Sequence, residues 1–179
     1  MDSSFASATA TLLTLRDGQR ILINPATPDD TAPLSDLLLR LTPQTLRLRY
    51  LSARCFTTAT AWAEAERMTH GRATLIATPV QRAFTEAVAV AELVPDHADA
   101  TVGHLGIVVR DDWQGLGLGT ALIRELLHHA PPLGLATIRA DLLAENDGAR
   151  RLLAPLDFPR TTATRYGETQ VLLRLPSAA

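Results

Sequence analysis

The sequence contains no lysine, so all 17 of its basic residues are arginines. This absence excludes mechanisms that use a lysine as general base or as a Schiff-base nucleophile. Nineteen acidic residues outnumber the arginines and give a net charge of −2. The chain therefore lacks the basic excess with which proteins neutralise nucleic-acid phosphates. No apolar run approaches the roughly 18 residues that a membrane-spanning helix requires. We expect neither a nucleic-acid partner nor a membrane.

Cysteine is nearly absent as well. Cys55 is the only one, which excludes an intrachain disulfide and is typical of a protein in the reducing cytoplasm. The length of 179 residues and the 46% of hydrophobic residues suit one globular domain. Residues 1–15 are rich in Ser, Thr and Ala and lack the basic start of a secretory signal. We expect a flexible tail over residues 1–15 and a single domain over residues 16–179.

The apolar periodicity predicts strands and helices in a mixed order. Strands are expected over residues 20–24, 73–77, 87–94, 102–109 and 136–142, with a hairpin over 161–175. Helices are expected over residues 27–41, 42–50, 57–70, 117–130 and 146–156. Residues 102–142 then form a right-handed crossover between two parallel strands, whereas the strands before them pair antiparallel. This order indicates an α+β fold.

The most informative segment follows the apolar, β-branched strand that ends at Val109. After a short polar turn, Gly115, Gly117 and Gly119 stand at alternate positions and lead directly into a helical pattern. The first N–H groups of a helix lack an internal partner, and the helix dipole adds partial positive charge there. Glycines let an anion approach this backbone closely. The segment therefore predicts a cradle for a phosphorylated cofactor.

Two common phosphate-binding motifs do not match these glycines. A dinucleotide fingerprint, G-x-G-x-x-G, would need its third glycine at Thr120 or at Leu122, depending on the alignment. It would also start directly after the first strand of a doubly wound sheet. A P-loop needs Gly-Lys-Ser/Thr, and the chain has no lysine.

The spacing Gln114-x-x-Gly117-x-Gly119, led by a strand ending Val108-Val109-Arg110, resembles the acyl-CoA motif of the GNAT N-acetyltransferase superfamily. The segment Asn146-Asp147-Gly148-Ala149-Arg150-Arg151-Leu152, followed by Leu156-Asp157-Phe158, resembles the second motif of that superfamily. Residues 15–30 and 40–50 are similar to the start of GNAT domains in bacterial Pat-type protein-lysine acetyltransferases. The resemblance covers about residues 15 to 175. It implies a central, mostly antiparallel twisted sheet with one parallel splayed strand pair and helices on both faces.

The resemblance also implies where acetyl-CoA would bind. The pyrophosphate would lie on N–H groups of residues 114–120, the pantetheine arm would pair with residues 107–109, and the N–H of Val108 would bind the thioester oxygen. The cofactor-binding residues expected on this basis are Ile107, Val108, Val109, Gln114, Gly115, Leu116, Gly117, Leu118, Gly119, Thr120, Asn146 and Arg150. Asn146 also has the position of a helix N-cap.

The catalytic groups are less clearly indicated. Pat-type domains carry a Glu three residues before the position of Ile107, where this chain has His104. An imidazole can accept a proton at neutral pH, and the alternative is a histidine whose ring nitrogens are satisfied locally. Glu92 is the second candidate base, because it shares a strand face with Val90. The Tyr that many members place after the second motif is Leu153 here, so no general acid is assigned.

The implied activity is acetyl transfer from acetyl-CoA to a primary amine, a protein lysine or a small molecule, by direct attack. The alternative is a catalytically degenerate, acyl-CoA-binding regulatory module, because the usual Glu and Tyr are replaced. A nucleotide oxidoreductase is a third class, which NAD binding would reveal. His70, His97 and His104 are too scattered in the sequence to suggest a metal site. The oligomeric state stays open, and a homodimer is compatible with the sequence.

Overall fold

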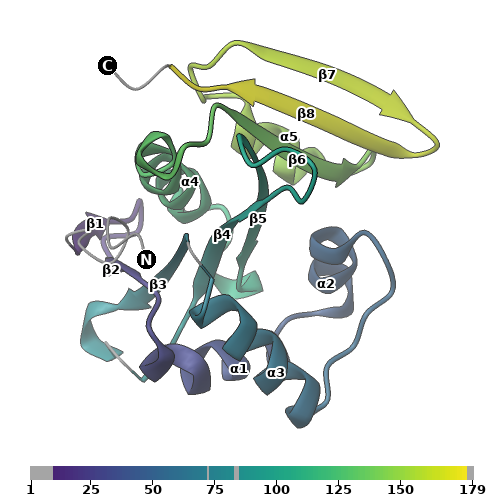
Figure 1. Cartoon of the computed structure of the whole chain (residues 1–179). Coiled ribbons are helices and arrows are strands. Elements are labelled where there is room, and N and C mark those ends of the chain that lie inside the picture. Colours follow the sequence, from purple (N-terminus) through teal and green to yellow (C-terminus); the bar gives the residue numbers. More distant parts are fainter. Residues whose placement is uncertain (1–9, 72, 83–84, 177–179) are drawn as a thin grey trace.

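A computed structural model describes residues 10–71, 73–82 and 85–176. Their strands form one eight-stranded sheet with the spatial order β1-β2-β3-β4-β5-β6-β8-β7 (Figure 1). The strands are β1 (Thr11–Thr14), β2 (Arg20–Pro25), β3 (Thr74–Pro79), β4 (Ala89–Pro95), β5 (Val102–Val109), β6 (Thr137–Leu143), β7 (Arg160–Arg165) and β8 (Glu168–Arg174). Only β5 and β6 pair in parallel, and every other neighbouring pair is antiparallel. This confirms the predicted fold class.

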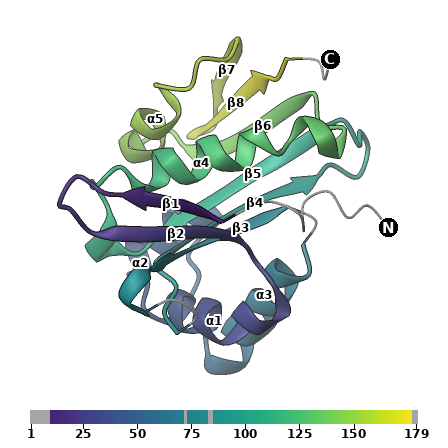
Figure 2. The same ribbon diagram turned by 90° about the vertical axis from the view of Figure 1, so that its left-hand side faces the viewer.

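In the described part of the chain, five α-helices cover the two faces of the sheet. They are α1 (Thr31–Leu39), α2 (Pro43–Tyr50), α3 (Thr58–Thr69), α4 (Leu118–His128) and α5 (Asp147–Leu153). One hydrophobic core packs α4 and α5 against the sheet, and the other packs α1, α2 and α3 against it. The two groups of helices lie on opposite sides of the strands in Figures 1 and 2. Within the described residues, no helix is long and apolar enough to span a membrane.

The alternation of side chains along β5 assigns its residues to the two cores. Val108 belongs to the core of α1, α2 and α3, whereas Leu105, Ile107 and Val109 pack against the core of α4. His104 and Gly106 therefore face the same side as Val108, toward α2, because successive strand residues point to opposite faces. This parity decides which residues of β5 can contact which ligand.

The predicted tail is wrong over residues 11–15. Thr11–Thr14 forms β1 and pairs antiparallel with β2, and the Leu15 side chain is buried. The Thr11 hydroxyl donates to Glu125 of α4, and the N–H of Arg16 donates to the carbonyl of Leu116. These long-range contacts stabilise a hairpin that the local composition did not indicate. Residues 1–9 lie outside the described residues.

Candidate functional site

The site begins where β5 and β6 separate. Their parallel pairing covers only Val102–His104 and Thr137–Arg139. Beyond these residues a cavity opens between the strands, lined by residues 105–107 of β5 and 140–142 of β6. A larger cleft of about 680 Å³ adjoins it and reaches from β5 to the N-terminal end of α4. Sites for small organic ligands commonly have about this volume, on the order of 300–1,000 Å³.

The glycines after β5 form the wall of this cleft. Gly115 has φ +75° and Gly117, the residue before α4, has φ +92°, a conformation that L side chains rarely adopt. A Cβ on Gly115 would have no heavy atom within 4 Å, and one on Gly117 would meet only Arg16 Nε at 3.8 Å. The backbone is thus open to a ligand, with the first N–H groups of α4 beside it. The arrangement is that of an anion cradle.

Most of the predicted cofactor-binding residues are brought together here. Those that line the cleft are Ile107, Val108, Val109, Gln114, Gly115, Gly117, Gly119, Thr120 and Asn146. Leu116 and Leu118 do not line it with their side chains, and Leu118 is buried in the core. Asn146 caps α5 by accepting a hydrogen bond of 2.9 Å from the N–H of Ala149, as its sequence position predicted.

Arg150 lies outside this lining. Its guanidinium donates to the carbonyl of Ala144 and to Asp147, whereas the neighbouring Arg151 lines the cleft. Consecutive helix residues point about 100° apart, and here Arg151 is the one that points to the cleft. The geometry favours Arg151 as the phosphate partner.

The backbone hydrogen bonds of β5 exclude the expected oxyanion donor, the N–H of Val108. The N–H of Arg110 donates to Val88, and Val108 pairs with Val90 in the same register. Backbone groups of an antiparallel strand point alternately to its two neighbours, so the N–H of Val108 points toward β4. The N–H groups of Ile107 and Val109 point to the other edge, where β6 has separated. Ile107, rather than Val108, can donate to a ligand between the strands.

A cluster of charged side chains lies on the α2 side of the sheet. Glu92 is only 4% exposed, and its Oε1 accepts from Arg49 Nη2 at 2.6 Å and from Arg67 Nη2 at 2.9 Å, while Oε2 accepts from Arg67 Nη1 at 3.0 Å. Burial acts to lower the pKa of Arg67, but hydrogen bonds to Glu92 and Glu64 outweigh it and raise the pKa above its ordinary value. Both oxygens of Glu92 are thus engaged by guanidinium groups, which disfavours this residue as a base.

Gly106 provides the space for Arg49. A Cβ at Gly106 would lie 2.7 Å from Arg49 Cζ and 3.0 Å from Nη1, so the guanidinium lies directly on the backbone of β5. Arg49 lines both the large cleft and the cavity between β5 and β6. No local pattern in the sequence indicates this contact, because Arg49 and Glu92 are 43 residues apart.

His104 lies two residues before Gly106 on the same face of β5. Its Nε2 lies 2.7 Å from Asp96 Oδ2, and its Nδ1 lies 3.9 Å from Asp141 Oδ2. The hydrogen bond from His104 lowers the pKa of Asp96 to about 2. Since a carboxylate can only accept, Nε2 donates, and in the neutral ring Nδ1 then carries the lone pair. His104 itself does not line the two cavities, but Asp141 lines the one between β5 and β6.

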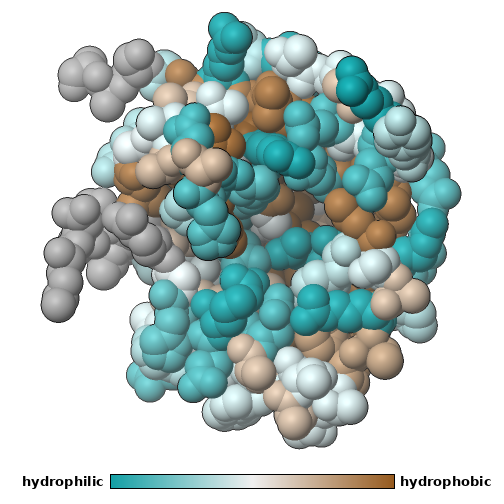
Figure 3. Space-filling model, turned by 45° about the vertical axis from the view of Figure 1, so that its right-hand side comes forward, coloured by the Kyte–Doolittle hydropathy of each residue, from teal (hydrophilic) through white to brown (hydrophobic). Residues whose placement is uncertain are grey.

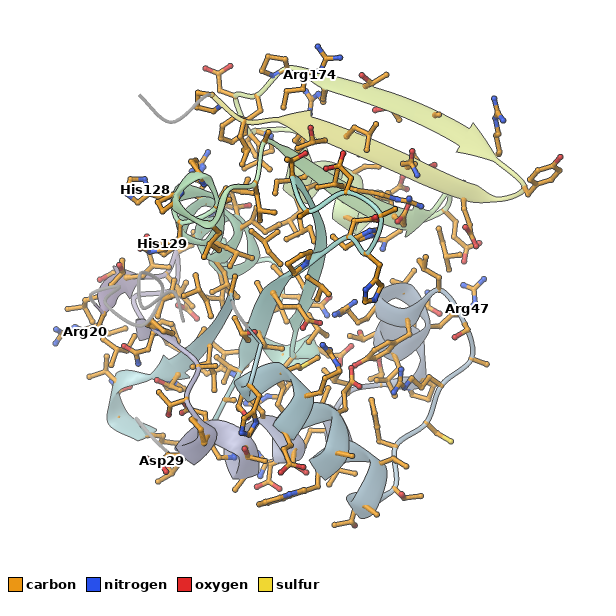
Figure 4. All side chains as sticks on the ribbon, in the orientation of Figure 1. Arg20, Asp29, Arg47, His128, His129 and Arg174 are labelled. Atoms are coloured by element: carbon orange, nitrogen blue, oxygen red, sulfur yellow. The ribbon has the colours of Figure 1, made fainter. Side chains whose placement is uncertain are left out.

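The position of α2 over the site is fixed by Asp111, in the turn after β5. Its carboxylate accepts from the hydroxyls of Thr42 and Thr45 at 2.8 and 2.6 Å, at the start of α2. Arg47 lies at the outer side of α2 (Figure 4). It pairs with Glu145, which lines the large cleft. His128, the last residue of α4, and His129, which follows it, lie across the molecule from α2 in the same view, and neither lines the two cavities. In the space-filling view, apolar residues are visible in the hollow that crosses this face, with mostly polar residues around it (Figure 3).

Arg16 is a functional candidate that the sequence did not indicate. It comes from the β1–β2 hairpin and lines the cleft beside Gly117. Arg16 follows the segment predicted as a tail, and no motif links it to residues a hundred positions later. The fold alone brings it to the cradle.

The comparisons with known proteins agree with this geometry. A family model described as the acetyltransferase (GNAT) family matches residues 44–158, which is more than half of the chain. The chain belongs to this family. The GNAT domain of S. lividans PAT has a similar fold, with a TM-score of 0.79, 20% identity, and coverage of 93% of this chain and 97% of that one. The predicted membership of the GNAT superfamily, with a likeness to Pat-type domains, is therefore confirmed.

Two further solved structures share the fold of this GNAT protein. One is yncA, a putative acetyltransferase from Salmonella typhimurium solved with its cofactor acetyl-CoA, with a TM-score of 0.65, 20% identity and coverage of 89% of this chain and 96% of that one. The other is a cAMP-binding acyltransferase from Mycobacterium smegmatis, with a TM-score of 0.63 and 22% identity. The match covers 97% of this chain but only 50% of that one. At these identities the likeness concerns the fold.

Proposed function

We propose that the protein transfers an acetyl group from acetyl-CoA to a primary amine by direct attack on the thioester. Membership of the acetyltransferase family supports the reaction class. The observation that carries the proposal is the junction of three features at one cleft. These are the separated strands β5 and β6, the glycines with positive φ, and the N-terminal end of α4.

The donor would be held mainly by backbone. The cradle of residues 115–120 suits a diphosphate, with Arg16 and Arg151 as cationic neighbours. Acetyl-CoA supplies the activated acetyl group as a thioester. The exposed edge of β5 offers the N–H and C=O groups of Ile107 and Val109 to an amide-bearing arm. The N–H of Ile107 would donate to the thioester oxygen as negative charge develops on it.

His104 is the base that we propose. The attacking amine must lose a proton, the C–N bond forms, the C–S bond breaks, and the thiolate leaves with the electron pair of that bond. The Nδ1 lone pair of His104 would take the proton, directly or through a water, with Asp96 fixing the tautomer from the other side of the ring. Glu92 is less suited, because Arg49 and Arg67 occupy its oxygens. Asp141, near Nδ1, would attract the ammonium form of the acceptor.

The test is to measure CoA binding by calorimetry and thiol release from acetyl-CoA with a panel of primary amines and a lysine-bearing protein. We expect binding of CoA and turnover with at least one acceptor, and a loss of kcat of about 10²- to 10⁴-fold in His104→Gln. Tight binding without turnover on any acceptor would favour the regulatory module. Absence of binding would refute the proposal, and binding of NAD instead would favour an oxidoreductase. The cytoplasmic location remains a prediction.

A further inference from the structure

We propose that the acceptor is a free amino acid, with its carboxylate on Arg49 and its amine at His104. This inference rests on the proposed acetyl transfer and names the acceptor class for the same site. It depends on three observations on the α2 side of β5: the placement of Arg49, the distribution of charge, and the spacing of the two groups.

The placement of Arg49 leaves most of its donors for a ligand. Its side chain is 17% exposed and lines both cavities, so the guanidinium is held in place but still accessible. Among the described residues, its only hydrogen bond is the one from Nη2 to Glu92. A guanidinium has five N–H donors in a planar fork that matches a carboxylate. Glu92 therefore holds one end of the guanidinium, while Nη1 and Nε remain to bind an anion.

The charges around this point leave a positive excess. Three guanidinium groups, of Arg49, Arg54 and Arg67, are paired with two carboxylates, of Glu64 and Glu92. Among the described residues, this cluster sums to three positive and two negative charges, or +1. Arg54 also lies over the ring of Tyr50, at 4.2 Å from its centroid.

The end of the site at His104 has the opposite sign. Asp96 and Asp141 flank the imidazole, and Arg139 pairs with Asp141 at 2.8 Å. With a neutral imidazole, the local sum is one positive and two negative charges, or −1. One face of the sheet therefore presents a negative end and a positive end side by side. A zwitterion with an ammonium and a carboxylate is complementary to both.

The spacing between the two ends suits a short acceptor. His104 and Gly106, on which Arg49 lies, are alternate residues of β5 and so are about 6.6–6.8 Å apart along the strand. A ligand that contacts both groups at about 3 Å therefore has its nitrogen and its carboxylate only a few bonds apart, as in an α-amino acid. The side-chain amine of a peptide-bound lysine has no carboxylate at this distance on its own residue.

The experiment compares matched pairs of acceptors in the thiol-release assay with acetyl-CoA. Each free amino acid is assayed beside its carboxamide, which keeps the amine and the side chain but lacks the negative charge. The amine of the carboxamide is the less basic, so a preference for the acid cannot arise from a larger unprotonated fraction. We expect kcat/KM to favour the acid by about 10- to 100-fold, as for a charge-assisted bidentate contact. Equal values for acid and amide would overturn the inference.

Two arginines on α2 offer a matched pair of variants. In Arg49→Gln we expect the preference for the acid to fall toward one, mainly through KM, with partial recovery in Arg49→Lys. Arg47→Gln removes a charge two residues away, on the outer side of α2, and should keep the preference. An undiminished preference in Arg49→Gln would overturn the inference. If that variant did not fold, the comparison of acid and amide on the wild-type protein would still test the acceptor class.

The failure of this inference is distinguishable from failure of the proposed function. Turnover with carboxamides or lysine peptides, but no preference for free acids, refutes only the acceptor class. If no amine is acetylated although CoA binds, the anion subsite is tested by calorimetry, in which amino acids and their amides are titrated into the CoA-loaded protein. Heat with the acids alone would support the anion subsite, and no heat with either would refute it.

Discussion

Replacing Gly117 by aspartate tests the cradle on which the whole site depends. The residue has φ +92°, so any L side chain here adds strain of about 1–2 kcal/mol. That strain lowers the free energy of unfolding but is the same with and without ligand. The carboxylate adds a second effect that appears only on binding. At about 5 Å from a bound phosphate, with an effective dielectric constant of about 20, it repels each phosphate charge by about 3 kcal/mol.

The expected result of Gly117→Asp is therefore a loss of CoA affinity on the order of 100-fold or more. Gly117→Ala separates the two effects, because a Cβ here would meet only Arg16 Nε, at the ordinary contact distance of 3.8 Å. The alanine variant should lose stability by about 1–2 kcal/mol and keep its affinity within a few-fold. Isothermal titration calorimetry at two salt concentrations measures the difference, which should shrink as salt screens the repulsion. Equal affinity of the aspartate and alanine variants would refute the placement of the diphosphate.

Glu92→Gln leaves Arg49 and Arg67 facing a neutral amide in a buried position. It should lower the free energy of unfolding, measured by urea denaturation, by about 2–3 kcal/mol, while CoA affinity stays within a few-fold. Unchanged stability would contradict the buried ion pair. Asp96 should titrate near pH 2 in carbon NMR and move upward in His104→Ala. Because folding lowers the pKa of Asp96, the carboxylate contributes fully to stability above about pH 3.8, and this contribution is lost as the pH falls toward 2. An ordinary pKa of Asp96 in the wild-type protein would exclude the His104 contact. Burial raises the pKa of Tyr50 to about 12, although the positive charge of Arg49 opposes this shift, so in a Tyr166→Phe background the tyrosinate absorbance should appear near pH 12. This raised pKa also makes the fold less stable as the pH rises from 10 to 12, and a midpoint near 10 would show that Tyr50 is not buried.

The elements nearest the cradle were predictable because their signals are local. The bounds of β5, Val102–Val109, agree with the predicted strand, and α4 begins one residue after the predicted start. A β-branched apolar run, a polar turn and alternating glycines each restrict the backbone by steric rules that act over a few residues. The anion cradle follows from the same few residues. Fold class and cofactor class could therefore be predicted together.

The β1–β2 hairpin could not be predicted in this way. Its first strand is a Thr- and Leu-containing segment after a Ser/Thr/Ala-rich stretch, with no turn signal beyond Asp17-Gly18. Its stability comes from pairing with β2 and from contacts with α4 and with Leu116, about a hundred residues later. Contacts between residues so far apart produce no periodic pattern in the sequence. Arg16, which this hairpin carries to the cleft, was missed for the same reason.

The choice between neighbouring or chemically equivalent residues also needed the structure. Arg150 and Arg151 are equal in sequence terms, and only the position of α5 decides that Arg151 lines the cleft. Glu92 on a strand face could be a free base or a buried ion-pair partner. Arg49 and Arg67, from two different helices, decide between them. Tertiary contacts, not local chemistry, distinguish these alternatives.

The alternation of β5 explains how one strand can serve two substrates. Odd-numbered residues, such as Ile107, direct their backbone N–H groups to the edge left by β6, where the donor would lie. Even-numbered residues direct their side chains to the face covered by α2, where His104 and the guanidinium above Gly106 would meet the acceptor. A shift of the β4–β5 register by one residue would exchange both sets at once, so that donor and acceptor groups would be lost together. The pairing of Glu92 with Gly106 across β4 and β5, reinforced by Arg49, is therefore as important for the chemistry as the groups that would touch the substrates.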